Sequence, residues 1–407
     1  MQDPPLSDFP RDEYDARIER LRSELDRARL DGIIVLNEFN HRYLSGHWGE
    51  RFPFFPTASI YSADGRAVVI CSAGEKGQAE ASSWVGDIRA YDWDEHEAHS
   101  RAAVEMLADA AREMGIDGGR IGRETSGRIG ASLDDIAYLE RRMPHAAWGN
   151  ANTVLKRLRA IKSPREVDTM RRAIEITEDA RAQTFAEVHV GMTERELFRT
   201  MVSNLFRAGS DGLGYVLVKH LDGSYGYSDR PYEADDVIYI DAGAIHKGYW
   251  CDRQRFAAFG DPSEDVRTGY SLLHELTRAM LEEVRAGTSA REFTERYLRH
   301  VERIFGHLDG AAPMMPRWAG HGIGLEEAEG PSLSLDSDAV LEPGNLIMVE
   351  PLVLWGDGWY TTEDCVVVTE DGYEEVGPPT PADLPVVPLD AATGDGGSPR
   401  PRTGAAA

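Results

Sequence analysis

The sequence lacks the features that mark several protein classes. Its three cysteines, Cys71, Cys251 and Cys365, share no close spacing, which argues against a disulfide framework and against a thiolate metal site. No stretch approaches the roughly 20 apolar residues that span a bilayer, and the first residues lack a basic region followed by an apolar run. Basic residues are also few, since 44 Lys and Arg stand against 70 Asp and Glu. The net charge of −26 leaves no basic footprint for a phosphate backbone. We therefore expect a cytoplasmic protein without a membrane or nucleic-acid partner.

What is present is enough hydrophobic sequence, 42% of 407 residues, to build two domains with separate cores. The first, residues 1–155, alternates expected helices and strands, which is typical of a small α/β domain. We expect its helices at residues 14–30, 100–114 and 132–142, and its strands at residues 32–37, 58–62 and 67–71.

The second domain, residues 156–378, has the pattern of an α+β fold. A helix is expected to begin at Ser163-Pro164, because proline is tolerated in the first turn. Further helices are expected at residues 194–208, 265–286 and 290–305, and strands at 237–241, 248–256, 346–354 and 359–369. The tail, residues 379–407, is rich in Pro, Gly, Ala and Asp, so we expect it to be disordered.

Acidic residues in this second domain lie at the ends of apolar runs. Asp241 follows Val237-Ile-Tyr-Ile240, Glu350 follows Leu346-Ile-Met-Val349, and Glu363 precedes Cys365-Val-Val-Val368. A carboxylate in such a place is costly to bury unless it is paired or coordinates a metal.

Asp252 and His321 complete a candidate ligand set of four carboxylates and one imidazole. Asp252 lies beyond the turn at His246-Lys-Gly248, so a hairpin could bring it beside Asp241. His321 is flanked by glycines that allow close approach of the backbone. Taken singly, the aspartates could be edge carboxylates paired with Arg253 and Arg255, and the histidine could be structural. Five such coincidences favour one metal site.

These motifs resemble the creatinase, prolidase and aminopeptidase P family, whose fold is called pita-bread. The resemblance spans residues from about 15 to 378. Its most specific segments are Ile161-Lys-Ser-Pro-Arg-Glu-Val-Asp-Thr-Met170, Asp241-Ala-Gly through Asp252, His321-Gly-Ile-Gly-Leu, Leu341-Glu-Pro-Gly344 and Glu363 before Val-Val-Thr-Glu-Asp-Gly372.

The resemblance implies a site for two divalent metal ions. Asp241 would bind one ion, His321 and Glu350 would bind the other, and Asp252 and Glu363 would bridge them. This ligand set suits manganese, iron, cobalt or zinc, and such a centre lowers the pKa of bound water. It also implies a homodimer acting on a small molecule or short peptide.

Two histidines that peptidases of this family carry are not found at the matching positions of this chain, although an alignment slip in the loop could place His220 at one of them. The position seven residues after His321 is Ala328, and the position about 17 residues before Asp241 falls at Ser224 or Tyr225. Because these imidazoles assist proton transfer in the peptidases, we consider His220 and Glu327 as replacements. The candidate catalytic residues are therefore Glu327, Glu350 and His220. Glu327 could equally belong to a solvated acidic turn.

Substrate contacts are expected in two places. In creatinase-like dimers the amino-terminal domain of one protomer reaches the partner's site, and residues 41–55 carry aromatics, histidines and arginines suited to an anionic group. Arg51 is the candidate for a substrate carboxylate, and ordinary loop packing is the alternative. The other candidate substrate-binding residues are Ser224, Tyr225 and Trp318.

Three functions follow from this sequence. The first is a dinuclear metallohydrolase that cleaves a C–N bond, of the Xaa-Pro dipeptidase or aminopeptidase P type. The second is a metal-dependent lyase of the same fold acting on a small zwitterion, resembling the dimethylsulfoniopropionate lyases and favoured by Ala328 with Glu327. The third is a non-catalytic pita-bread binding module, which the complete ligand set disfavours.

Overall fold

The computed structural model describes residues 3–48, 57–92, 98–125, 127, 130–223 and 227–389. It divides into two compact domains after Arg165, where the sequence suggested a boundary near residue 155. Among these described residues, no helix is both long and apolar enough to cross a membrane.

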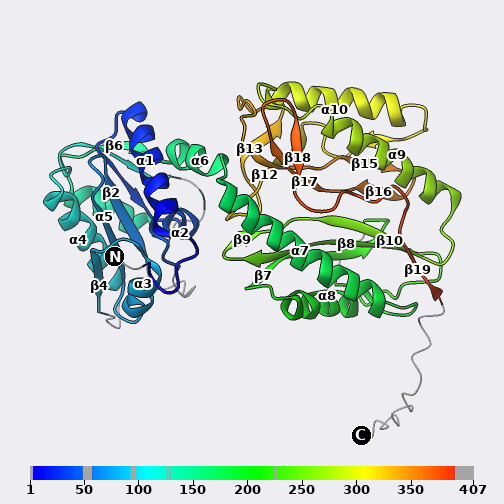
Figure 1. Ribbon diagram of the computed structural model, residues 1–407, viewed down its shortest axis with the longest axis horizontal. Helices are drawn as coiled ribbons and strands as arrows, with labels where there is room; N and C mark the ends of the chain where they lie inside the picture. The colour runs from blue at the N-terminus through cyan, green and yellow to red at the C-terminus, as the bar shows by residue number, and fades with distance from the viewer. Residues whose placement is uncertain are drawn as a thin grey trace, which may run out of the picture. The chain divides into compact units, whose positions relative to one another are not determined.

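The amino-terminal domain is built on one six-stranded mixed sheet, in the order β4-β3-β2-β1-β5-β6 (Figure 1). β1 pairs antiparallel with β2 and parallel with β5, so the alternation of strands and helices predicts the fold class but not this mixed direction. The strands are β1 (Gly32–Val35), β2 (Ala58–Ser62), β3 (Ala67–Ser72), β4 (Ile88–Tyr91), β5 (Arg120–Arg123) and β6 (Ala147–Asn150).

Helices cover this sheet and bury its apolar side chains. Ile60 and Ile70 of the sheet pack in one core with Leu107 and Ala111 of α4. The helices are α1 (Arg11–Ala28), α2 (Glu38–Ser45), α3 (Lys76–Ser82), α4 (Ala98–Glu113), α5 (Leu133–Arg142) and α6 (Asn152–Ala160).

The carboxy-terminal domain contains two larger sheets and a small one. Their strand orders are β19-β10-β8-β7, with β9 paired to β8, then β13-β12-β14-β17-β18, and β11-β15-β16. The strands are β7 (Leu213–His220), β8 (Val237–His246), β9 (Tyr249–Trp250), β10 (Gln254–Phe259), β11 (Ala312–Pro313), β12 (Trp318–Gly322), β13 (Glu329–Ser334), β14 (Leu346–Val349), β15 (Leu352–Trp355), β16 (Gly358–Thr361), β17 (Asp364–Val368), β18 (Tyr373–Glu375) and β19 (Val386–Val387).

Each large sheet has helices on its outer face. α7 (Pro164–Glu187) and α8 (Glu194–Ala208) pack against the β7-β8-β10 sheet, and α9 (Glu264–Leu281) and α10 (Ala290–Phe305) pack against the sheet that contains β12, β14 and β17 (Figure 1). The bounds predicted for α8 and α10 are confirmed. The inner faces of the two sheets are left to form the site.

Three predicted long strands are interrupted in the structure, and each interruption contains a candidate metal ligand. The segment 248–256 breaks between β9 and β10 at Asp252, 346–354 breaks between β14 and β15 at Glu350, and 359–369 breaks between β16 and β17 at Glu363. A carboxylate in a break can leave the plane of the sheet, which periodicity in the sequence does not reveal.

The segment predicted as the beginning of the tail is folded. Val386 and Val387 form β19, which pairs in parallel with β10, and Val387 is buried. Thr380 is also buried and donates a backbone hydrogen bond to Asp364. Residues 390–407 of the predicted tail lie outside the described residues.

Candidate metal centre

Alternation along β8 directs Asp241 toward the inner face of its sheet. Ile238 and Ile240 belong to the core under α7 and α8, whereas Val237 and Tyr239 belong to a different core on the inner side. Because successive side chains of a strand point to opposite faces, Asp241 continues the inner row. Asp241 is paired with Gln254 of β10, so Asp252, two residues earlier, is placed for the same side.

The second sheet contributes ligands by the same rule. Ile347 and Val349 of β14, and Val366 and Val368 of β17, pack toward α9 and α10. Alternation therefore turns Glu350 and Glu363, which adjoin these strands, the other way.

Five buried side chains meet between the two inner faces in two overlapping groups. Ligand atoms of Asp252, His321 and Glu350 lie within 4.8 Å of one another, and so do those of Asp241, Asp252 and Glu363. Asp252 belongs to both groups, which is the arrangement expected of a residue shared by two cations. The structure thus brings together all five side chains that the sequence suggested as ligands.

His321 is oriented for coordination by its backbone. Its Nδ1 lies 2.8 Å from the carbonyl oxygen of Gly322, which can only accept, so Nδ1 carries the hydrogen. Nε2 then faces Glu350 Oε1 at 3.0 Å and Asp252 Oδ2 at 3.5 Å. An unprotonated nitrogen and carboxylate oxygens repel each other unless a proton or a metal ion lies among them. A hydrogen bond that fixes the other ring nitrogen is typical of histidine metal ligands.

The carboxylates of this centre are buried without enough donors. Four of their oxygens accept no hydrogen bond within the described parts of the chain when His321 Nε2 carries no hydrogen: Asp241 Oδ1, Asp252 Oδ1, Glu350 Oε1 and Glu363 Oε2. Buried polar atoms are normally satisfied, so these four call for another partner. The chemistry of the set, oxygen-rich with one imidazole, fits divalent cations.

Electrostatics lead to the same conclusion. Burial, together with the negative charges of Asp252 and Glu350, raises the pKa of Asp241 well above its ordinary value. Burial and the charges of Asp241 and Asp252 likewise raise the pKa of Glu363. For His321, burial acts to lower the pKa, but the carboxylates of Glu350 and Asp252 outweigh it and raise the pKa well above its usual range. Without metal, protons must take the place of the missing positive charge.

Two further inner-face residues were not found from the sequence. Gln254 is fully buried, and neither polar atom of its side-chain amide has a hydrogen-bond partner in the part of the chain that the structure describes. Tyr215 lies on β7 near an irregularity in its pairing with β8. Burial and then the charges of Asp241 and Glu327 raise the pKa of Tyr215 above its ordinary value. Both were missed because β7 was not predicted and because Gln254 lies in a segment read as one continuous strand.

Glu327 lies within electrostatic range of the centre, since its charge contributes to raising the pKa of both Asp241 and Tyr215. Its side chain is half-buried rather than fully solvated. Ala328 is exposed. The acidic turn therefore reaches the centre through Glu327.

The structure does not bring His220 to the centre. Val218, two residues earlier on β7, packs under α7 and α8, so alternation directs His220 to that outer face. There His220 Nδ1 lies 2.8 Å from Glu194 Oε1, and its ring stacks on Tyr232. A histidine on the opposite face from Asp241 cannot replace the absent peptidase histidine in this arrangement.

The remaining predicted substrate residues are placed unevenly. Trp318 stacks on the His321 ring with centroids 5.7 Å apart, so it adjoins the centre. Arg51, Ser224 and Tyr225 lie outside the described residues.

The two histidines of the 41–55 segment point into the amino-terminal domain. His41 contacts the Ser59 hydroxyl at 3.0 Å and His47 contacts the Ser82 hydroxyl at 3.1 Å, and both are buried. They are therefore packed inside the domain and do not present a surface for a substrate.

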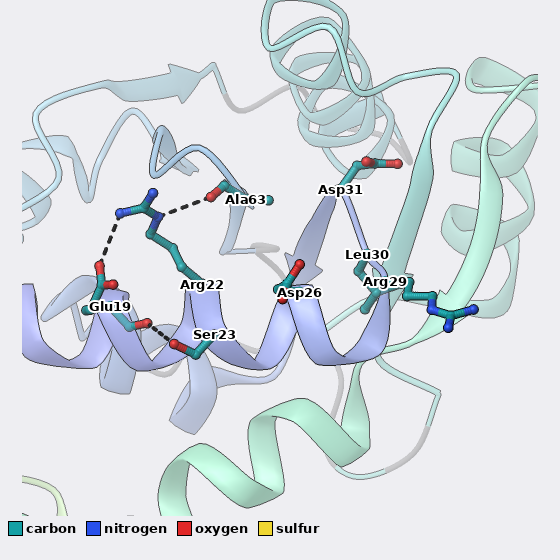
Figure 2. Close-up of a pocket in the computed structure, with 8 residues that line it drawn as sticks. All are labelled: Glu19, Arg22, Ser23, Asp26, Arg29, Leu30, Asp31 and Ala63. Atoms are coloured by element: carbon teal, nitrogen blue, oxygen red, sulfur yellow. Dashed lines mark hydrogen bonds and ion pairs between the residues drawn. The ribbon is translucent and has the colours of Figure 1, made fainter.

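A surface pocket of about 620 Å³ lies in the amino-terminal domain and includes none of these ligands. In Figure 2, Arg22 donates to the Glu19 carboxylate and to the backbone carbonyl of Ala63, and Ser23 donates to the backbone carbonyl of Glu19. Because the pocket contains none of the candidate ligands, it forms no part of the candidate centre. Its lining residues are Glu19, Arg22, Ser23, Asp26, Arg29, Leu30, Asp31 and Ala63.

Comparison with known proteins identifies both domains. Residues 17–161 match the family described as Creatinase/Prolidase N-terminal domain, and residues 168–370 match Metallopeptidase family M24. The chain belongs to metallopeptidase family M24. It is therefore a metallohydrolase with the pita-bread fold, of a family that uses divalent metal ions.

The similarity to other M24 proteins extends over nearly the whole chain. A Mycobacterium tuberculosis protein named "Probable dipeptidase PepE" is 27% identical, with 94% of this chain and 98% of that one covered. The Xaa-Pro dipeptidase of Lactobacillus helveticus is 25% identical, with 91% and 99% covered. Among solved structures, the Xaa-Pro dipeptidase from Bacillus anthracis is 25% identical, with a TM-score of 0.76 and 92% and 99% covered.

The relatives named as dipeptidases favour one of the three functions that the sequence allowed. Because they match nearly the whole chain, they support the hydrolase over the lyase and over the non-catalytic module, both of which share the fold. The absence of imidazoles at Ala328 and near residue 224 remains a feature of this chain.

Proposed function

We propose that this protein is a dipeptidase that hydrolyses Xaa-Pro dipeptides with the help of two divalent metal ions. One observation carries the proposal: five buried side chains converge in two overlapping groups, and four of their carboxylate oxygens accept no hydrogen bond from any described residue when His321 Nε2 is unprotonated. The names of the relatives, Xaa-Pro dipeptidase among them, support the choice of substrate.

The proposed ligands divide according to the two groups. Asp241 and Glu363 lie with Asp252 on one side, and His321 and Glu350 lie with Asp252 on the other. Asp252 would serve both ions, and the family resemblance suggests that Glu363 does so too. When bound, divalent ions would polarise the substrate carbonyl and make water more acidic.

Proton transfer would be carried out by residues in and around the proposed ligand set. Glu350 and Glu327 are the candidate bases, Glu327 because its charge reaches Asp241. The raised pKa of Tyr215 keeps its phenol protonated near neutral pH, so the hydroxyl can donate a hydrogen bond to an oxygen that gains negative charge. Tyr215 would thus supply a donor that the absent histidines supply in other members.

The substrate would be held by residues beside this centre. Trp318, stacked on His321, offers an apolar face to a proline ring. Ser224, Tyr225 and, from the partner protomer of a homodimer, Arg51 complete the proposed contacts.

Manganese is the metal we would test first, with iron, cobalt and zinc as alternatives. The cysteines, all three free and buried, suit a reducing cytoplasm, which is our proposed location.

The test is an assay of metal-loaded protein on matched substrates. Ala-Pro, its reversed partner Pro-Ala, a proline-containing pentapeptide, an N-acylated amino acid and a sulfonium zwitterion would be incubated separately, and released amine or alkene would be quantified. We expect release from Ala-Pro that is abolished by chelator and restored by manganese. Alkene release from the sulfonium compound without amine release from any amide would overturn the proposal.

A further inference from the structure

Lys219 is a buried cation without an anionic partner. Its side chain belongs to β7 and is only 3% exposed. Its ammonium lies 4.1 Å from the ring centre of Tyr239 and 4.0 Å from that of Trp359. Across the described part of the chain, it has neither a hydrogen-bond acceptor nor a carboxylate at ion-pair distance.

Strand register places Lys219 on the metal face of the sheet. Lys219 is paired with Tyr239, and Leu217 is paired with Asp241, so Lys219 and Asp241 are diagonal neighbours on one face. Diagonal neighbours in antiparallel strands are about 7–8 Å apart at Cα, within reach of long side chains. Lys219 is thus two residues along β7 from Leu217, the residue that is paired with the proposed metal ligand Asp241.

On its other side, the Lys219 ammonium contacts Trp359, which belongs to the part of the chain that also carries Glu363. Trp359 lies on β16, four residues before Glu363. Burial lowers the pKa of Lys219 to about 8, while the charges of Asp241 and Glu363 act to raise it, so the ammonium senses both carboxylates. The lysine therefore borders the Asp241–Glu363 end of the centre, away from His321 and Glu350.

Two aromatic rings are not enough to compensate the charge of a buried ammonium. The two cation–π contacts offset only part of the cost of removing a charge from water. Arg253 and Arg255, which are equally buried, solve the problem by pairing with Asp364. Lys219 has no such carboxylate among the described residues, so a carboxylate from a ligand would complete its environment.

We propose that Lys219, held between Tyr239 and Trp359, binds the free carboxylate of the substrate and thereby selects dipeptides over longer peptides. The proposal rests on the function proposed above, because it places the scissile amide at the metal centre. In a dipeptide the carboxylate is only a few bonds beyond that amide. A longer peptide presents a neutral amide at the same position.

The experiment compares two substrates that differ only in this group, Ala-Pro and Ala-Pro amide. We expect the wild-type kcat/KM for the acid to exceed that for the amide by about 10- to 100-fold, as for one hydrogen-bonded charge. Lys219→Met should reduce this ratio to near one, mainly through KM, whereas Lys219→Arg should keep part of it. Metal content, measured on each variant, serves as the control for an intact centre.

An equal rate on acid and amide by the wild-type enzyme would overturn the inference and leave the dipeptidase function standing, whether or not the variants fold. A preference for the acid that survives in Lys219→Met would also overturn it.

If neither substrate is cleaved, the proposed function fails, and binding decides the inference separately. Calorimetry would then compare N-acetylproline with N-acetylprolinamide. Tighter binding of the acid that is lost in Lys219→Met would support the carboxylate site. Equal binding, or none, would contradict it.

Discussion

Glu363 and Asp364 are neighbours in sequence and equally buried, yet they have opposite surroundings. Asp364 Oδ1 accepts a hydrogen bond from Arg255 Nη2 at 2.7 Å, lies 3.5 Å from Arg253 Nη2 and accepts another from Thr380. Glu363 Oε2 has no hydrogen-bond partner among the described residues. Within ion-pair distance, the described residues supply two arginines to Asp364 and no cation to Glu363.

This contrast separates a structural charge from a functional one. The Asp364 cluster joins β17 to β10 with every charge compensated, so it stabilises the fold. The cluster that includes Glu363 holds four carboxylates and a single imidazole. Its negative charges repel one another unless protons or bound cations compensate them. Removing an acid from each cluster should therefore have opposite consequences.

The largest effect is expected for Asp252→Asn, which weakens the residue shared by both groups. Partners outside the first ligand sphere already affect metal affinity or activity by about 10–100-fold, so losing a direct ligand should lower kcat/KM by more than about 100-fold. Bound metal should fall in parallel. Asp336→Asn, an exposed aspartate paired with Arg317, is the control and should leave both unchanged. Full activity and metal in Asp252→Asn would mean that the centre is misplaced.

The opposite cluster is broken by Asp364→Asn. Loss of this charge leaves the buried Arg255 without a carboxylate partner in the described parts of the chain, while Arg253 keeps its ion pair with Glu178, and this should lower the free energy of unfolding by about 3 kcal/mol. Urea unfolding of the metal-free protein would measure the change. In the same conditions Asp241→Asn should be stabilising, because it removes repulsion. The comparison fails if both variants shift stability in the same direction.

The pH dependence of the metal-free protein sharpens the contrast further. The raised pKa values of Asp241 and Glu363 mean that the folded state holds protons that the unfolded state has lost above about pH 4. Stability should therefore fall as pH rises, by about 1.4 kcal/mol per pH unit for each retained proton. We expect a lower Tm at about pH 7.5 than at about pH 5, with the difference reduced by saturating manganese. A Tm that is higher at the upper pH would contradict this.

The smallest effect on chemistry is expected for His220→Ala. The change removes a hydrogen bond to the buried Glu194, which should cost about 2 kcal/mol of stability. Because His220 faces away from Asp241, metal content should be kept and kcat should change by less than about threefold. A loss of kcat comparable to that of Asp252→Asn would return His220 to the catalytic residues.

The sequence predicts the metal face better than its surroundings, for a physical reason. Asp241, Glu350 and Glu363 stand out because each adjoins an apolar run, where an unpaired acid is costly. Lys219, Tyr215 and Gln254 carry no such signal. Their importance comes from strand register, which sets faces across segments distant in sequence.

His220 shows the same limit from the other side. Its closeness in sequence to the expected histidine position suggested a role in catalysis. However, His220 follows Lys219 directly on β7, and successive side chains of a strand point to opposite faces, so His220 points away from the metal face. Similarly, nothing in the composition of residues 379–389 reveals that β19 pairs with β10.

The most direct test of the account is the metal stoichiometry of the purified, manganese-reconstituted protein, measured together with Ala-Pro hydrolysis. We predict two equivalents of manganese per chain in the wild type, with activity that rises as the ions bind and a marked loss of bound metal in Asp252→Asn. Less than one tenth of an equivalent in the wild type, with or without activity, would contradict the claim that these five buried side chains form a metal centre.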